Sequence, residues 1–138
     1  MSQVKEIFKQ RLSEMGNKAL KDIKYYGVGY EDIQSGYESL GLKCPIMILK
    51  SRGTYESGWG NGYVRVPEGH EYYGKHYDEI TLGVHGGLTF SEVIVENDSY
   101  SWPEGHWIGF DTAHFGDNKE NWTKENVLKE TIQLFFQL

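Results

Sequence analysis

The chain has 138 residues, one cysteine and a net charge of −6, with a pI near 5.3. This length fits one domain that buries enough surface to fold without disulfides. The negative charge disfavours binding to a DNA or RNA backbone, but it allows a small anionic ligand or a basic protein partner. The first residues lack the apolar stretch of a signal peptide, and no apolar run approaches the roughly twenty residues of a membrane span. We therefore expect a single cytoplasmic domain over residues 1–138, with no membrane segment.

The first predicted element is a helix over about residues 2–23, because apolar side chains recur there at helical spacing. They are Val4, Ile7, Phe8, Leu12, Met15, Ala19, Leu20 and Ile23. Charged residues fall between them, so we expect this face to pack in the core rather than on a partner. Gly16 and Asn17 mark where the helix would bend or split. Residues 25–42 are rich in glycine and tyrosine without a clear period, and no element is predicted there.

Two strands are predicted next. Residues 45–50 form a mainly apolar run, and residues 63–66 form a short strand that Pro67 ends. A glycine-dense loop over residues 51–62 joins them. Cys44 directly precedes the first strand and has no partner for a disulfide, so we expect a buried, unreactive thiol in a reducing compartment.

A β-hairpin is predicted around Gly86 and Gly87. Residues 79–85 alternate between apolar and other side chains, which is typical of a strand. The two glycines permit the tight turn that joins hairpin strands, and residues 88–96 follow as the return strand. This register places His85 at the exposed tip, opposite Leu88, and keeps Glu92 too far along the strand to contact it.

The last predicted elements are a strand and a helix. Residues 106–111 form the strand, and Thr123 is the expected N-cap of a helix that runs to the C-terminus. The inward-facing residues of that helix are Val127, Leu128, Ile132, Phe135 and Phe136. The order of helix, several strands and helix predicts the α+β class, with a mainly antiparallel sheet and an N-terminal and a C-terminal helix packed on it.

The main candidate site combines carboxylates and an imidazole at a spacing of three residues. Asp111, His114 and Asp117 lie together after the last predicted strand. Such a set suits a divalent metal ion, and it equally suits acid–base catalysis in which a carboxylate orients the imidazole. His85 joins these three residues as a catalytic candidate if the hairpin tip reaches them. The alternative is that both aspartates cap turns and His114 packs against aromatic rings.

Further residues are candidates for contact with a substrate. The backbone amides of Gly86 and Gly87 are unshielded, so an anion could approach them closely. The loop over residues 67–77 carries His70, Tyr73 and His76, which provide hydrogen-bond donors and stacking surfaces. Trp107 shares one side of its predicted strand with Asp111 and is added to the set. The alternative for the loop is a solvated segment whose tyrosines cover the sheet.

Common nucleotide, zinc and hydrolase motifs are absent from the sequence. It contains no G-x-x-x-x-G-K-[ST] loop, no G-x-G-x-x-G after a strand, no C-x-x-C, no H-E-x-x-H and no G-x-S-x-G. NTPase, dinucleotide-dehydrogenase, zinc-ribbon and α/β-hydrolase functions therefore have no support.

Three segments together resemble a family of small proteins encoded by bacteriophages and prophages. The segments are YVRVPEGH (63–70), VHGGLTFS (84–91) and WIGFDTAHFGD (107–117), so the resemblance covers roughly residues 60–117. The resemblance implies the cytoplasm of an infected bacterium. It also implies a role against host defences, either by binding a host protein or by sequestering or degrading a nucleotide signal.

Two functions are expected from these patterns, beside a purely structural role. The first is a hydrolase that acts on a phosphorylated or nucleotide-like ligand through the His/Asp cluster, with a divalent metal ion as a possible cofactor. The second is a non-catalytic protein that binds a nucleotide signal or a host defence protein, with aromatic side chains as anchors.

Overall fold

A computed structural model describes residues 2–15, 18–22, 27–52, 57–95 and 102–138. Its helices are α1 (Ser2–Met15), α2 (Ala19–Asp22), α3 (Tyr30–Ser39) and α4 (Lys124–Phe136), with a short 3-10 helix η2 (Tyr77–Glu79). Its strands are β1 (Ile46–Lys50), β2 (Gly60–Val66), β3 (Phe90–Ile94) and β4 (Gly105–Phe110). The elements confirm the predicted α+β class.

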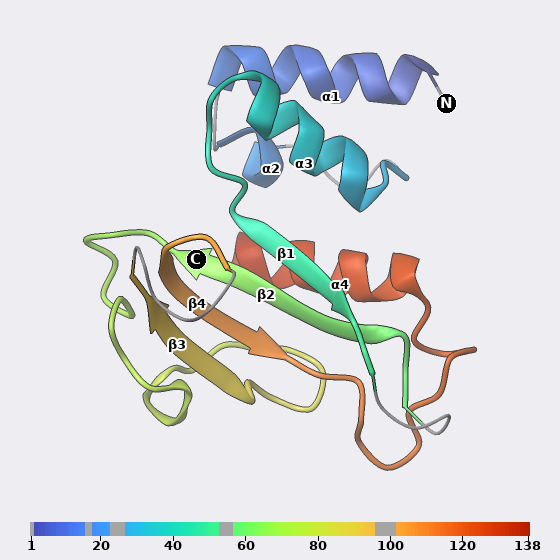
Figure 1. The fold of residues 1–138 in the computed structure, drawn as a ribbon, viewed down its shortest axis with the longest axis vertical. Helices are drawn as coiled ribbons and strands as arrows, with labels where there is room; N and C mark the ends of the chain where they lie inside the picture. The colour runs from blue at the N-terminus through green and yellow to red at the C-terminus, as the bar shows by residue number, and fades with distance from the viewer. Residues whose placement is uncertain (1, 16–17, 23–26, 53–56, 96–101) are drawn as a thin grey trace.

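The four strands form one antiparallel sheet in the order β1-β2-β4-β3. The two central strands pair from Gly62 with Phe110 at one end to Val66 with His106 at the other. Figure 1 shows the sheet with β1 and β3 at its two edges and α4 lying behind it. The loop after Phe110 and the loop after Val66 therefore leave opposite ends of the sheet, which separates the two regions described below.

Alternation along the strands builds a core on each face of the sheet. Val64 and Ile108 face α4, and they belong to the larger buried cluster, which also contains residues of α4 such as Leu128 and Ile132. The opposite face carries a smaller cluster of Met47, Tyr63, Ile94 and Trp107, with Leu49, Phe90 and Trp102 packed against it. The sheet is therefore covered by a helix on one side and by aromatic side chains on the other.

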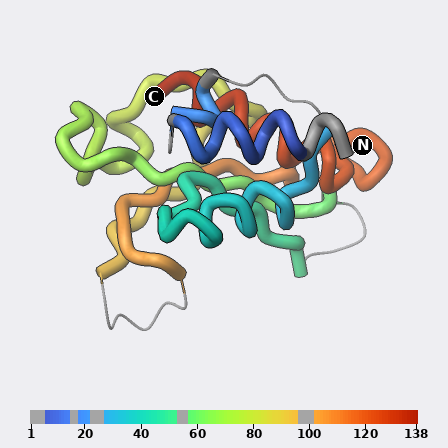
Figure 2. Tube along the Cα trace, turned by 90° about the horizontal axis from the view of Figure 1, so that it is seen from above, coloured from blue at the N-terminus to red at the C-terminus, as the bar shows by residue number. Residues whose placement is uncertain are grey.

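The N-terminal helices extend the larger core beyond the edge of the sheet. Phe8 and Leu12 of α1 and Ile33 and Tyr37 of α3 are buried in it, and the two helices lie side by side above β1 (Figures 1 and 2). The predicted helix over residues 2–23 is divided into α1 and α2, and residues 16, 17 and 23 lie outside the described residues. Over residues 25–42, where the sequence has no clear period, the structure has the helix α3.

The predicted hairpin is also wrong. A turn is present, since Gly87 N donates to Val84 O at 2.9 Å, and both glycines have positive φ. However, residues 80–84 form no strand, and β3 pairs with β4 instead. Side chains hold this extended segment in place of strand pairing: Gln137 accepts from Gly83 N at 2.8 Å and donates to Gly83 O at 2.6 Å.

The closing helix has the predicted cap and core face. Thr123 accepts a hydrogen bond from Asn126 N at 3.1 Å, which satisfies one of the free amides at the start of α4. Of the residues expected to face inward, Val127, Leu128, Ile132 and Phe135 are buried, and Phe136 is half-buried against the core. Across the part of the chain that the structure describes, every helix is too short or too polar to cross a membrane.

Candidate active site

The loop that follows β4 folds back onto the start of β2. Thr112 is buried, and its Oγ1 donates to Gly60 O at 2.7 Å while its carbonyl accepts from Gly58 N at 2.7 Å. Trp59 N then donates to Trp122 O at 2.8 Å. These bonds fix both ends of the loop, so its polar side chains lie on a rigid support.

Within this loop, Asp111, His114 and Asp117 form a compact turn. Asp111 Oδ1 accepts from Ala113 N at 3.1 Å, and Asp117 Oδ2 accepts from His114 N at 2.9 Å. The backbone closes the turn through Asp117 N, which donates to His114 O at 2.9 Å. Both aspartates therefore cap the turn, as one of the two alternatives expected. The same hydrogen bonds fix the position of the two carboxylates beside the imidazoles.

His85 contacts the carboxylate of Asp117, as the candidate set required. Its Nε2 lies 2.9 Å from Oδ1 and 3.1 Å from Oδ2. The Asp117 side chain is only 5% exposed and that of His85 is 26% exposed. Because a carboxylate accepts, Nε2 carries the proton in this pair, and Nδ1 of a neutral His85 carries the lone pair. The buried carboxylate thus orients an imidazole that remains partly accessible.

Two residues outside the predicted set, Trp122 and Glu130, complete the support of His85. The Trp122 ring lies over the imidazole, with centroids 4.2 Å apart and planes tilted by 37°. From α4, Glu130 Oε2 accepts from His85 N at 2.7 Å. The one signal in the sequence for Trp122 is its position five residues after Asp117. The contact of Glu130 with His85 depends on the tertiary fold and has no local signal.

His114 provides a second imidazole beside the first. The two rings meet edge to face with centroids 5.5 Å apart. His114 Nε2 lies 3.1 Å from Asp111 Oδ1, but this buried nitrogen makes no aligned hydrogen bond, so it is held less firmly than His85. A Cβ on Gly86 would lie 2.2 Å from the same Nε2, so only glycine leaves room for the ring. Gly86 therefore shapes the site, while a Cβ on Gly87 would meet no atom within 4 Å.

The arrangement fits acid–base chemistry better than metal binding. Among the described residues, no group of three or more His, Cys, Asp or Glu side chains is arranged to hold a metal ion. The carboxylates of Asp111 and Asp117 are instead each directed to an imidazole and to the backbone of the turn. Metal binding by Asp111, His114 and Asp117 remains a prediction without geometric support.

The other predicted substrate contacts lie elsewhere. His70 and His76 each accept a hydrogen bond from a backbone amide two residues further on, so both stabilise turns. The Tyr73 ring packs edge to face against His106, with centroids 5.7 Å apart. Trp107 is 1% exposed and belongs to the core on the face opposite α4. Of the six predicted substrate contacts, only Gly86 and Gly87 adjoin the His85 cluster.

Comparisons with known proteins add no assignment to this geometry. No family model, no curated protein and no solved structure matches the chain. The similarity to bacteriophage proteins therefore stays a prediction from the sequence.

Proposed function

We propose that the protein is a small hydrolase that acts on a phosphorylated or nucleotide-like ligand, with His85 as general base and His114 as general acid. The observation that carries this proposal is the pair of adjacent imidazoles, each beside a carboxylate of the same turn. Rings with centroids 5.5 Å apart can serve two oxygen atoms of one phosphoryl group. Acid–base catalysis of P–O bond hydrolysis uses two such proton transfers, one from the attacking water and one to the leaving oxygen.

In the proposed reaction, a water molecule attacks phosphorus while Nδ1 of His85 takes one of its protons. The bond from phosphorus to the leaving oxygen breaks, and protonated His114 donates a proton to that oxygen. One proton enters the protein and one leaves it, so hydrolysis consumes only water. A second turnover requires transfer of a proton from His85 to His114 through solvent or along the ring contact.

Asp117 is a positioning residue in this scheme. Its buried carboxylate holds the tautomer of His85 and stabilises the imidazolium that forms when His85 takes the proton. Because the same carboxylate accepts from His114 N, it also sets the distance between the two rings. Its loss should therefore lower the rate without removing either imidazole.

The bacteriophage resemblance gives this proposal a biological setting. In the cytoplasm of an infected bacterium, the ligand of such a hydrolase would be a nucleotide signal of the host defence. This setting depends on the resemblance of residues 60–117 alone, and the chemical test below does not require it.

The test is hydrolysis of bis(p-nitrophenyl) phosphate, p-nitrophenyl phosphate and a panel of linear and cyclic nucleotides. We expect His85→Ala to lower kcat on every hydrolysed substrate by roughly a hundredfold or more, and His114→Ala to do so on nucleotides, whose leaving oxygen needs a proton. His76→Ala is the matched control, because it removes an exposed imidazole outside the cluster. Wild-type kcat in His85→Ala, or the lack of turnover of every substrate by the folded wild type, contradicts the proposal.

The alternative function is a non-catalytic protein that binds a nucleotide signal or a host defence protein. It is favoured by one observation: two hollows of about 480 Å³ each share Lys43, Arg65 and Pro67 near the start of β1 and the end of β2, and His85 lines neither of them. A nucleotide that stabilises the protein against heat and is recovered intact would support this alternative. Recovery of a cleaved nucleotide would support the hydrolase.

A further inference from the structure

A cation-lined hollow lies where β1 begins and β2 ends. It has a volume of about 480 Å³, and the described residues that line it include no acidic residue and four cations: Lys18, Lys21, Lys43 and Arg65. The other lining residues are Gly41, Leu42, Pro45, Pro67 and Phe135. The hollow thus combines positive charge with an apolar floor, in a chain whose net charge is −6.

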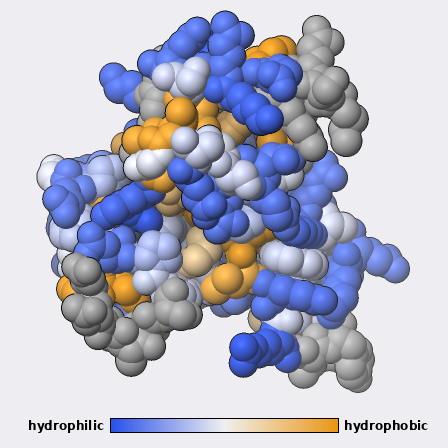
Figure 3. All heavy atoms as spheres, turned by 45° about the horizontal axis from the view of Figure 1, so that its top comes forward, coloured by the Kyte–Doolittle hydropathy of each residue, from blue (hydrophilic) through white to orange (hydrophobic). Residues whose placement is uncertain are grey.

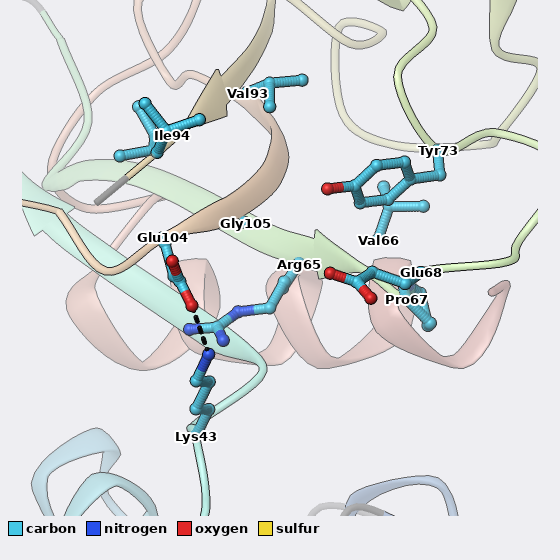
Figure 4. A pocket seen from close by; sticks show the side chains of 11 residues that line it. Lys43, Arg65, Val66, Pro67, Glu68, Tyr73, Val93, Ile94, Glu104 and Gly105 are labelled. Atoms are coloured by element: carbon cyan, nitrogen blue, oxygen red, sulfur yellow. Dashed lines mark hydrogen bonds and ion pairs between the residues drawn. The ribbon is translucent and has the colours of Figure 1, made fainter. Parts of the chain in front are cut away.

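A second hollow of about 480 Å³ adjoins it and shares Lys43, Arg65 and Pro67 (Figure 4). The second hollow adds Tyr73 and two carboxylates, Glu68 and Glu104. In Figure 4 the side chains of Lys43, Arg65 and Glu104 converge, and Lys43 Nζ donates to Glu104 Oε1 at 2.9 Å. One exposed glutamate therefore stands beside two cations at the junction of the hollows.

Arg65 is fixed at this junction by its neighbours in the sheet. Its guanidinium carbon lies 4.8 Å from the centre of the Trp107 ring, which is the position of a cation–π contact. Its Nε is buried without a hydrogen-bond partner. Burial also lowers the pKa of Arg65, because the charged form loses part of its hydration. A fixed, poorly hydrated guanidinium gains more from an anion than a freely solvated one does.

We infer that the joined hollows at Lys43 and Arg65 bind a small organic phosphate whose planar or apolar body lies against Pro45, Pro67 and Phe135. The volume of each hollow is in the range of sites for small organic ligands, about 300–1,000 Å³. Several cations around one position suit a doubly charged phosphate, and the planar fork of Arg65 can contact two phosphate oxygens at once. A nucleoside monophosphate has both the charge and the planar body.

In the proposed site, the carboxylate of Glu104 occupies the position of the phosphate when no ligand is bound. It is exposed, and the ion pair with Lys43 lowers its pKa, so it is ionised at neutral pH. An exposed pair of this kind contributes little to stability, because water and salt screen both charges. A phosphate can therefore displace it at small cost, while the negative charge of Glu104 competes with the ligand.

This site is separate from the His85 cluster. Asp111 follows the end of β4 at which Gly62 pairs with Phe110, whereas Arg65 and Pro67 lie at the opposite end of that pairing. The inference therefore does not depend on the proposed hydrolase, and each can fail while the other holds.

The experiment is calorimetric titration of the full chain with AMP, pyrophosphate and adenosine at low salt. We expect AMP to bind most tightly, pyrophosphate more weakly, and adenosine not to bind. Lys43→Gln and Arg65→Gln should each weaken AMP binding at least tenfold, and Glu104→Gln should tighten it several-fold.

The matched control is Lys50→Gln, which removes the same charge from an exposed lysine at the far end of β1. Equal AMP affinity in Lys43→Gln and Lys50→Gln would overturn the inference, as would the absence of AMP and pyrophosphate binding at millimolar concentration. If Arg65→Gln does not fold, Lys43→Gln and Glu104→Gln still test the inference. Both replace exposed side chains, and they should change the AMP affinity in opposite directions.

Discussion

Replacing Gly86 with alanine tests whether the two imidazoles are packed as described. Gly86 has φ +68, and an added Cβ would lie 2.2 Å from His114 Nε2, 2.5 Å from Cδ2 and 2.8 Å from Cε1. The ring must retreat by more than about 1 Å to reach ordinary contact distances of roughly 3.5 Å. The methyl group therefore displaces the ring that we propose as the general acid.

The expected cost has two parts. An alanine in the left-handed region costs about 1–2 kcal/mol. The steric part is limited, because the His114 side chain is 35% exposed and can rotate toward solvent. Its cost is then that of the lost contacts with Asp111 and His85, about 1 kcal/mol. The total loss in unfolding free energy should be about 2–3 kcal/mol.

Gly87→Ala provides a matched control for the backbone part. Gly87 has φ +82, and a Cβ there would meet nothing within 4 Å. Urea unfolding of both variants should therefore show Gly86→Ala to be the less stable by about 1 kcal/mol. In a His114→Ala background this difference should vanish, because the methyl group no longer meets a ring. NMR signals of the His85 and His114 rings should shift in Gly86→Ala and stay in place in Gly87→Ala.

Equal stability of the two single variants would refute the described packing. The same holds if the extra cost of Gly86→Ala persists when His114 is alanine. In either case the His114 ring would not lie against the turn, and its role as a partner of His85 would lose its basis.

Three further predictions concern the rest of the fold. Thr123→Ala should lower the unfolding free energy by about 1 kcal/mol in urea unfolding, because it removes the cap of α4. Burial lowers the pKa of His106, so the unfolded chain takes up that proton first. The unfolding free energy should then fall as the pH drops below about 6.5, and His106 contributes as much as about 1.4 kcal/mol per pH unit to this fall. In His106→Asn the unfolding free energy should therefore fall less steeply. Burial raises the pKa of Cys44 to about 11, so its labelling by a disulfide reagent at pH 8 should be roughly a hundredfold faster in unfolded protein than in native protein.

The elements with a strong local pattern could be predicted from the sequence. The apolar run of β1, the strand that Pro67 ends and the cap at Thr123 all follow from neighbouring residues. Helix α3 was missed because its buried face includes Gly36 and Tyr37, which do not count as an apolar stripe. Gly36 is nevertheless what allows α1 to approach, since a Cβ there would lie 2.8 Å from Leu12 Cδ2.

The hairpin failed for a different reason. Alternation over residues 80–84 shows that the segment is extended with one buried side, but it does not identify the partner. β3 finds its partner in β4, and the side chains of Gln137 and Glu130 bind residues 83 and 85. Such side-chain bonds to backbone from 45 or more residues away have no periodic signal in the sequence.

The candidate site could be predicted in part for the same reasons. The turn at Asp111, His114 and Asp117 is formed by contacts within seven residues, so the spacing of the three residues predicted that they lie together. The approach of His85 to Asp117 was anticipated, although through a hairpin that does not exist. The cation-lined hollow at Lys43 and Arg65 could not be foreseen, because its residues come from four separate segments of the chain.

The strand order has a consequence for how the chain folds. β1 pairs with β2 and β3 with β4, each across a short connection, and the central pairing of β2 with β4 joins residues 40 or more positions apart. Hairpins close in microseconds, whereas distant pairing must first overcome the entropy of a long loop. We expect the two halves of the sheet to form early and their joining, with the docking of α4, to limit the rate. In pulsed hydrogen-exchange refolding, amides between β1 and β2 should then become protected before those between β2 and β4.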